Sequence, residues 1–421
     1  MQKVVGNTGW LFADKFIKAG GELTIGLWMA RYLGPQNFGL LNYAIAFISV
    51  FSAPASLGLH KIAVRDMVQQ PTCRDEILGT ALILRLSTGL LLGIAALISI
   101  VYLRPNDKVV HWIVGVSAAG LLFQSADVIS YWFQSQMQAR SDVMARSSAY
   151  MITNIARISL ILGKAKVLSF GLLPFLEIVL RCVNLTVIYR RLGCSLNQWK
   201  FSFDRARVLS KASWPLVLSG IAVTIYMRID QVMIGQMLSD DAVGIYSAAV
   251  KLSEAWYFMP MAIASSSFPM LLRSKEYDSE RYKKQLHDLF RITLRLTYFI
   301  VIPTSLLANP IMTLLLGQGY SLAGSVLSIH IWSGLFVSLG AIRELWMAAE
   351  GLTQFSFLTT TSGAIINILI NYFLIPISGI NGAAIATLIS YGFAIFLACF
   401  IHPKTRYIAK VMASSLILIK V

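Results

Sequence analysis

The sequence has little charge, little cysteine and no long polar segment. Only 13% of its 421 residues are charged, and its longest polar stretch, residues 190–211, is too short to bury a hydrophobic core of its own. A soluble catalytic domain is therefore excluded, and any function must be carried by apolar helices and short loops. The four cysteines, Cys73, Cys182, Cys194 and Cys399, show no paired spacing, which argues against disulfides and a zinc site.

Motifs of enzyme chemistry are also missing. The chain contains no nucleophile paired with a base, no Gly-Lys-Ser phosphate loop and no His-rich metal spacing. We therefore expect no enzymatic activity, no cofactor, no metal and no direct use of ATP. The N-terminal segment lacks the basic start, short apolar core and cleavage site of a signal peptide, so we expect the first helix to be retained.

Hydrophobic residues make up 56% of the chain, which is typical of a polytopic membrane protein. Windows of apolar residues predict an all-α integral membrane protein with about twelve transmembrane helices. The expected spans are residues 8–31, 38–60, 77–103, 109–133, 143–163, 167–189, 213–238, 242–272, 289–316, 323–347, 355–376 and 382–401.

Basic residues alternate between the two sides of these spans. The net charge is +16, and most loop Lys and Arg residues fall on the side that holds both termini. The opposite side has only Arg104, Lys108, Lys164 and Lys166. The positive-inside rule then predicts a multi-pass membrane protein with both termini in the cytoplasm. We expect no nucleic-acid partner.

The first span carries charges that a lipid-facing helix would not tolerate. Asn7, Asp14, Lys18 and Glu22 fall within one arc of roughly 80° on a helix, and Lys15 lies beside it. This polar stripe predicts that the first helix lines a wet interior. The alternative is that Lys15 and Lys18 only neutralise Asp14 and Glu22 within the bundle.

Further charges fall within the other spans, and ionisable residues at membrane depth are functional candidates by default. The predicted contacts to an anionic substrate are Lys15, Lys18, Arg85, Arg157, Arg228, Lys251 and Arg343. The predicted ion-coupling carboxylates are Glu22, Asp127, Asp230 and Glu254. For Asp127, a lone acid in the fourth span, a hydrogen-bonded structural role is the alternative. The spacings of Lys251 with Glu254 and of Glu177 with Arg181 also suit structural ion pairs, an interpretation that we favour for the second pair.

The chain also repeats itself weakly at an offset of about 205 residues. Pro54 and Pro260 fall within the second helix of each half, which predicts a kink in both. The predicted organisation is an N-terminal six-helix lobe, a cytoplasmic linker, a C-terminal six-helix lobe and a cytoplasmic tail. Their bounds are residues 1–192, 193–212, 213–402 and 403–421.

Three stretches resemble a known family. The N-x-x-W of residues 7–10 with the A-R-Y-L-G-P-x-x-F-G of residues 30–39 looks like the opening of the Wzx-type O-antigen flippases. These form the polysaccharide transporter branch of the MATE-like exporters. The segments Y-M-R-I-D-Q-V-M-I-G at 226–235 and V-G-I-Y-S-A-A-V-K-L-S-E at 243–254 are similar to the family's seventh and eighth helices, and residues 376–387 resemble its last turn.

This resemblance implies a V-shaped pair of lobes around a cationic cavity. The implied function is movement of undecaprenyl-diphosphate-linked oligosaccharide from the cytoplasmic to the periplasmic leaflet of the bacterial inner membrane during O-antigen and lipopolysaccharide biosynthesis. H⁺ or Na⁺ and a polysaccharide polymerase are the further partners that we consider. The alternatives are a MATE-like exporter of small cations, which a basic interior disfavours, and a membrane glycosyltransferase or polymerase, which the short predicted periplasmic loops disfavour.

Overall fold

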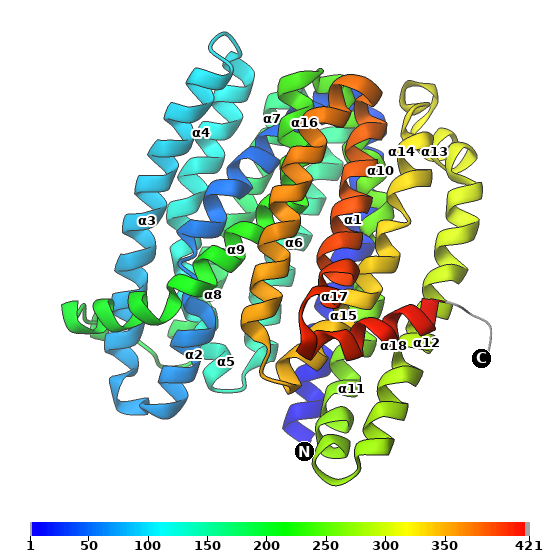
Figure 1. Ribbon diagram of the computed structural model, residues 1–421. Coiled ribbons are helices and arrows are strands. Elements are labelled where there is room, and N and C mark those ends of the chain that lie inside the picture. Colours follow the sequence, from blue (N-terminus) through cyan, green and yellow to red (C-terminus); the bar gives the residue numbers. More distant parts are fainter. Residues whose placement is uncertain (1, 417–421) are drawn as a thin grey trace. The chain divides into compact units, whose positions relative to one another are not determined.

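The protein is built almost entirely of helices. The computed structural model describes the backbone of residues 2–416 and the side chains of residues 17–416, and this part of the chain contains no β-strand (Figure 1). Eight helical segments within it are long and apolar enough to cross a membrane. The predicted class, an all-α integral membrane protein, is confirmed.

Two glycines break helices that are otherwise continuous. Residues 17–69 are helical almost throughout, and 53 residues in one straight helix would measure about 80 Å, far more than the roughly 30 Å of a bilayer core. Gly34, with φ of 72°, divides this stretch, and Gly379, with φ of 59°, divides the other long one. Positive φ strains residues that carry a Cβ, so glycine suits both breaks.

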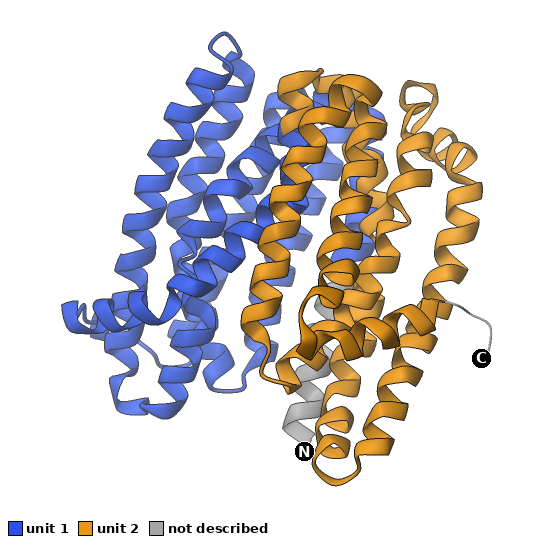
Figure 2. Cartoon of the chain, viewed as in Figure 1, with its two compact units in different colours: residues 1–33, 37–232 blue, residues 34–36, 233–421 orange. Residues whose placement is uncertain are grey.

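The chain divides into two compact units. The first consists of residues 1–33 and 37–232 (Figure 2). Its elements are α1 (Gln2–Ala55), α2 (Leu59–Gln69), η1 (Pro71–Cys73), α3 (Arg74–Leu103), α4 (Lys108–Phe123), η2 (Gln124–Asp127), α5 (Val128–Ser135), α6 (Ala139–Leu162), α7 (Val167–Gly171), α8 (Leu173–Arg191), η3 (Leu196–Gln198) and most of α9 (Phe203–Met237). Helix α3 packs along α4 and α6 along α8. A core that includes Trp132 and Tyr189 joins α2, α3, α5, α6 and α8.

The second unit consists of residues 34–36 and 233–421. Its elements are α10 (Asp240–Glu254), α11 (Phe258–Tyr277), α12 (Ser279–Leu306), α13 (Ala308–Leu316), η4 (Gln318–Tyr320), α14 (Ala323–His330), α15 (Ser333–Ala349), α16 (Thr353–Tyr391), η5 (Gly392–Leu397), α17 (Ala398–Ile401), η6 (Pro403–Thr405) and α18 (Arg406–Leu416). Helix α15 packs against α11 and α12 around a core that includes Phe290 and Leu339. The boundary between the units falls within α9, and the two six-helix lobes stay a prediction.

Each predicted span lies within a helix or a pair of helices, but two of these helices begin well before the predicted span. Helix α9 begins at Phe203 instead of residue 213, and α12 begins at Ser279 instead of residue 289. Asp278 sets the early start of α12, because its side chain accepts a hydrogen bond from the Arg281 N–H at 2.9 Å. Hydropathy misses this start because the first turns are polar.

Helix interruptions recur at matching places in the two halves. The second helix of the first half breaks just after Pro54, between α1 and α2, and that of the second half just before Pro260, between α10 and α11. The predicted kinks are therefore confirmed. The fourth helix is also broken, by the 3₁₀ turn η2 in the first half and at Ile331 and Trp332 in the second. Such mid-helix breaks often mark hinges.

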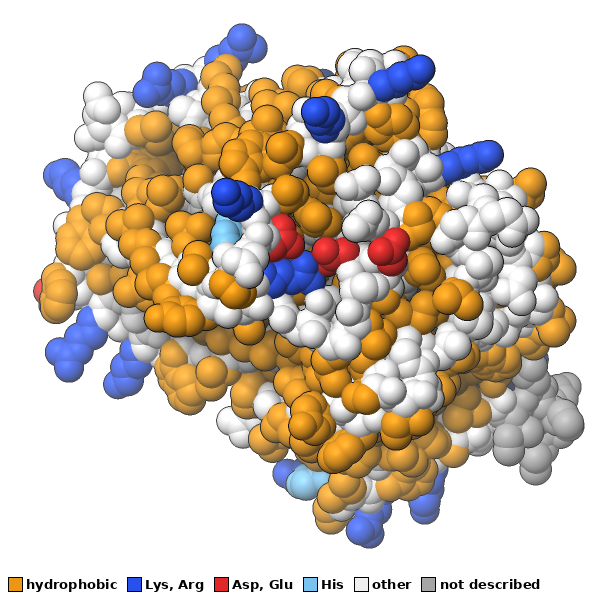
Figure 3. Space-filling view, turned by 90° about the horizontal axis from the view of Figure 1, so that it is seen from above, with side chains coloured by type: hydrophobic (Ala, Val, Ile, Leu, Met, Phe, Trp, Pro, Cys, Tyr) orange, Lys and Arg blue, Asp and Glu red, His pale blue; other side chains and the backbone are white. Residues whose placement is uncertain are grey.

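On the face seen in Figure 3, most Lys and Arg side chains stand apart from one another among hydrophobic side chains. The turn between α3 and α4 lies at the top of the first unit in Figure 1. Within the turn, Arg104 lies 3.3 Å from the Asp107 carboxylate and 3.8 Å from the ring centre of Tyr43. Arg104, one of the few basic residues that the sequence predicts on the side opposite the termini, therefore has an acidic and an aromatic partner.

Candidate functional site

The charged stripe of α1 is held in place by α6. Lys18 is half-buried, Glu22 one turn later is exposed, and both take part in interactions. The Tyr150 hydroxyl donates a hydrogen bond to the Lys18 carbonyl at 3.1 Å. This approach requires Gly21, because a Cβ there would overlap the same hydroxyl. The side chains of Asn7, Asp14 and Lys15 lie outside the described residues.

Helices α6 and α8 extend this polar region. Arg157 donates a hydrogen bond to the Asn154 side-chain oxygen at 2.9 Å. The Glu177 carboxylate interacts electrostatically with Arg181, Arg157 and Lys18. Charged groups that are far apart in the sequence are therefore gathered in one neighbourhood of the first unit.

A second group of charges surrounds the 3₁₀ turn η2. Arg181 donates a hydrogen bond to the Asp127 carboxylate at 3.0 Å, and Arg85 lies 3.8 Å from the same oxygen. Arg85 is 6% exposed and also donates to the Tyr131 hydroxyl at 2.8 Å. The His60 ring lies 5.1 Å from the Tyr131 ring, between centroids. One carboxylate thus pairs with two guanidinium groups at the break in the fourth helix, and these three groups keep one positive charge in excess.

This arrangement adds partners that the sequence did not indicate. Asp127 lies between Arg85 and Arg181. Arg181 interacts with Glu177, as their spacing suggested, but its hydrogen bond goes to Asp127, 54 residues earlier. Spacing along one helix misses pairs that form between helices, because tertiary packing alone brings them together.

Helix α9 carries the next two candidates. Arg228 is half-buried, and Asp230 is 4% exposed. The Asp230 carboxylate accepts a hydrogen bond from the backbone N–H of Gln231 at 2.8 Å. Substrate contact by Arg228 and ion coupling by Asp230 stay predictions.

In the second unit, Arg343 has a clear structural partner set. It is 1% exposed and donates to the backbone carbonyls of Ala394 at 2.6 Å and Ile395 at 3.2 Å. Both carbonyls belong to η5, a π-helical turn, where hydrogen bonds shift from the α-helical pattern. Arg343 also donates to Glu344 at 2.8 Å and Thr359 at 3.0 Å. These contacts favour a structural role for Arg343, and its contact with substrate stays a prediction.

The remaining predicted residues of this unit lie on α10. Lys251 and Glu254 are half-buried, and both take part in interactions. Nearby, His330 hydrogen-bonds with the Ser253 hydroxyl at 2.9 Å, at the break between α14 and α15. The sequence carries no local signal for this pair, because 77 residues separate Ser253 from His330.

The charged side chains of the first unit indicate which kind of ligand it can bind. Lys18, Arg85, Arg157 and Arg181 supply four positive groups, and Glu22, Asp127 and Glu177 supply three negative ones. Charges at membrane depth persist when they are paired or hydrated. A ligand with several anionic oxygens can compete with these carboxylates for the basic groups, because ammonium and guanidinium groups bind phosphate strongly. The site therefore suits recognition of an anion better than covalent chemistry.

Comparison with known proteins adds two family matches. Residues 4–275 match the family described as "Polysaccharide biosynthesis protein", and residues 215–373 match the MatE family. The chain is 24% identical to a Haloferax volcanii protein named as a probable low-salt glycan biosynthesis flippase, Agl15, over 94% of this chain and 84% of that protein. A Shigella flexneri protein named as an O-antigen transporter is 21% identical, over 85% of this chain and 88% of its own length.

Solved structures share the fold. The lipid II flippase MurJ in an inward closed conformation superposes with a TM-score of 0.74 at 14% identity, covering 98% of this chain and 91% of MurJ. An inward-facing multidrug resistance MATE transporter of the MOP superfamily gives a TM-score of 0.74 at 14% identity, covering 94% of this chain and 96% of the transporter. At such low identity the likeness concerns the fold alone.

Proposed function

Because the chain belongs to the polysaccharide biosynthesis protein family, we propose that it is a flippase for undecaprenyl-diphosphate-linked oligosaccharide, an O-antigen unit or a related glycan. It moves this lipid from the cytoplasmic to the periplasmic leaflet of the inner membrane by alternating access of two lobes. The observation that carries the proposal is the group of intramembrane basic side chains in the first unit, Lys18, Arg85, Arg157 and Arg181. A diphosphate offers these groups several charged acceptors.

The names of the relatives support the substrate class. Agl15 is named for glycan biosynthesis and the Shigella flexneri protein for O-antigen transport. The match to the MatE family favours one rival, an exporter of small cations. An excess of basic groups would repel such a cargo.

Ligand binding to the purified protein distinguishes a flippase from an exporter of small cations. We expect undecaprenyl diphosphate to bind more tightly than uncharged undecaprenol, and added salt to reduce this difference through screening. Tetraphenylphosphonium serves as the cationic probe. Preferential binding of tetraphenylphosphonium would favour the exporter and contradict the flippase.

The orientation is tested by topology reporters, and the loop bias in Lys and Arg sets the expected result. We expect a periplasmic signal for fusions after Pro35, Asn106, Asp240 and Gly319. We expect a cytoplasmic signal for fusions after Arg74, Lys200 and Lys283. A reversed signal at one site between two correct neighbours would remove a span and rule out the arrangement of two six-helix lobes.

Energy coupling is tested at Glu22. In the proposed cycle, an arriving diphosphate competes with this carboxylate for Lys18, which links substrate binding to proton binding. We expect an imposed proton or sodium gradient to change the flipping rate or final distribution in vesicles, and Glu22→Gln to abolish that change. Asp127 is a poorer test, because its ion pairs also stabilise the fold. If neither gradient affects the wild-type protein, coupling is absent.

A further inference from the structure

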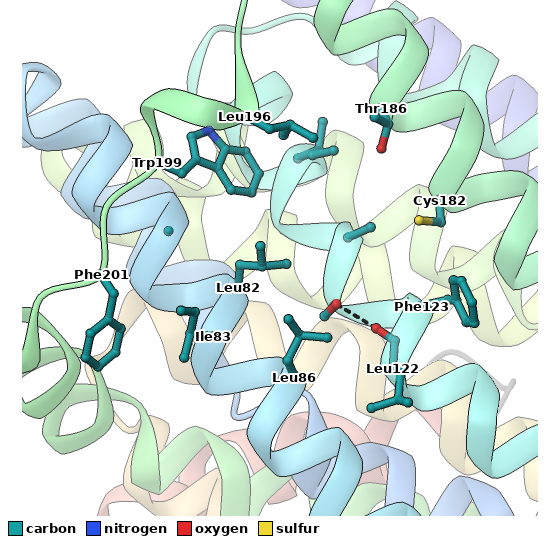
Figure 4. A pocket seen from close by; sticks show the side chains of 14 residues that line it. Leu82, Ile83, Leu86, Leu122, Phe123, Cys182, Thr186, Leu196, Trp199 and Phe201 are labelled. Atoms are coloured by element: carbon teal, nitrogen blue, oxygen red, sulfur yellow. Dashed lines mark hydrogen bonds between the residues drawn. The ribbon is translucent and has the colours of Figure 1, made fainter.

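The surface of the first unit has a groove that none of the charged side chains described above lines. Its volume is about 460 Å³, and its walls come from α3, from the region of α4, η2 and α5, from α8 and from residues 196–201 (Figure 4). This volume falls within the range of about 300–1,000 Å³ that is common for ligand sites. The groove is therefore large enough to hold part of a ligand.

The lining of the groove is chemically uniform. Leu82, Ile83 and Leu86 project from α3 on one side, and Phe123 lies on the other (Figure 4). The hydroxyl of Ser125, one of the few polar groups, donates a hydrogen bond to the Leu122 carbonyl at 2.6 Å. Such a surface offers hydrocarbon contacts and little polar recognition, so it suits an alkyl chain.

The segment that closes one end of the groove is firmly attached to α3. The Lys200 N–H donates to the Asp75 carbonyl at 3.1 Å, and the Ser202 N–H donates to the Thr80 hydroxyl at 3.1 Å. The Trp199 indole donates to the Tyr189 hydroxyl at 3.1 Å. Gly79 makes this fit possible, because a Cβ there would come within 2.5 Å of the Lys200 carbonyl oxygen. The wall is thus preformed.

A positive charge lies next to this apolar wall. Lys200 is exposed and stands between Trp199 and Phe201, which both line the groove. The two acids on the adjoining turn of α3 have arginine partners. Arg74 lies 3.0 Å from Asp75, and Arg205 lies 3.6 Å from Glu76. Because Lys200 adjoins two residues of the groove wall in the sequence, it supplies a positive charge near this end of the groove for an anionic headgroup whose alkyl chain occupies it.

We propose that this groove binds one acyl chain of an anionic phospholipid, with the phosphate of the lipid beside Lys200. The chain fills the space between α3, α8 and residues 196–201, and the headgroup lies at the membrane surface. Bound lipid then stabilises residues 196–201 against α3. None of Lys18, Arg85, Asp127 and Arg181 lines the groove, so the proposal does not depend on the proposed transport function.

Photo-crosslinking tests this proposal with the full-length protein in nanodiscs. Phosphatidylglycerol and phosphatidylcholine probes each carry a diazirine on an acyl chain, and peptide mass spectrometry identifies the labelled segments. We expect phosphatidylglycerol to label α3 around Ile83 and residues 196–201 about fivefold more than phosphatidylcholine does, the effect of about one favourable basic contact at a membrane surface. Equal labelling by the two probes would overturn the proposal.

Two pairs of variants assign the labelling to the groove. Lys200→Glu should reduce labelling by phosphatidylglycerol at least fivefold, whereas Lys211→Glu, the same charge change at an exposed residue of α9, should not. Leu86→Trp fills the groove and should reduce labelling, whereas Leu91→Trp, at a more exposed site of α3 outside the groove, should not. Equal effects within either pair would contradict the proposal, as would preferential labelling by a photoreactive undecaprenyl diphosphate.

Discussion

Replacement of Asp127 by asparagine is expected to lower the free energy of unfolding by about 2–3 kcal/mol. Loss of one partner from a buried ion pair typically costs about 3–5 kcal/mol, and the partial exposure of Asp127 and Arg181 reduces this value. The variant leaves Arg85 and Arg181 facing each other without the carboxylate that now lies 3.8 and 3.0 Å from them. Unfolding of the purified protein by sodium dodecyl sulfate in mixed micelles measures the change.

A double variant shows whether the cost arises from the uncompensated charges. Asp127→Asn combined with Arg181→Gln should be more stable than Asp127→Asn alone, because Arg85 then faces one fewer positive group and keeps its bond to Tyr131. The control is Asp75→Asn, which breaks the more exposed pair with Arg74 and should cost about 1 kcal/mol or less. Simple additivity of the Asp127 and Arg181 effects would show that the cluster does not act as a unit.

Loss of the charge at Lys18 is expected to impair transport while leaving the protein inserted. A charge-assisted hydrogen bond contributes about 1.5–3 kcal/mol, so Lys18→Gln should weaken binding of a diphosphate roughly tenfold to hundredfold. Arg228→Gln should act in the same direction. Surface polysaccharide, compared at equal protein level in the membrane, is the readout in cells.

The variant Lys18→Arg shows whether the charge or the shape of the side chain matters at this position. Lys18→Arg should keep activity if the group supplies a positive charge rather than a particular geometry. Lys164→Gln, an exposed residue in the turn between α6 and α7, is the control and should behave like the wild type. Full activity of Lys18→Gln and Arg228→Gln at normal protein level would show that neither residue contacts the substrate.

The fold was largely predictable from the sequence because membrane helices depend on local properties. A long apolar run predicts a span, and the prolines at positions 54 and 260 predicted interruptions that the structure contains. The resemblance to the Wzx-type family drawn from residues 30–39 and 226–254 is confirmed by the family matches. The start of α12 was missed because it depends on a cap at Asp278 and not on hydropathy.

The partners within the site were much less predictable. Arg85 meets Asp127 and Tyr131 because α3, η2 and α5 pack together, and residues 42 and 46 positions apart carry no local signal for such pairing. Arg343 illustrates the same limit. Its guanidinium group bonds with carbonyls of a π-helical turn about 50 residues later, and no spacing rule predicts where such a turn forms. Sequence identified the charged residues, and packing determined their partners.

Flipping by the purified protein in vesicles is the most direct test of the proposed function. Fluorescent undecaprenyl-diphosphate-linked oligosaccharide is placed in both leaflets, and a membrane-impermeant reagent modifies the glycan from outside. We predict that vesicles with the wild-type protein let the reagent reach the inner-leaflet pool, that Lys18→Gln slows this exposure, and that empty vesicles expose only the outer-leaflet pool. Identical exposure with wild-type protein and without protein, after confirmed insertion, would contradict the assignment as a flippase.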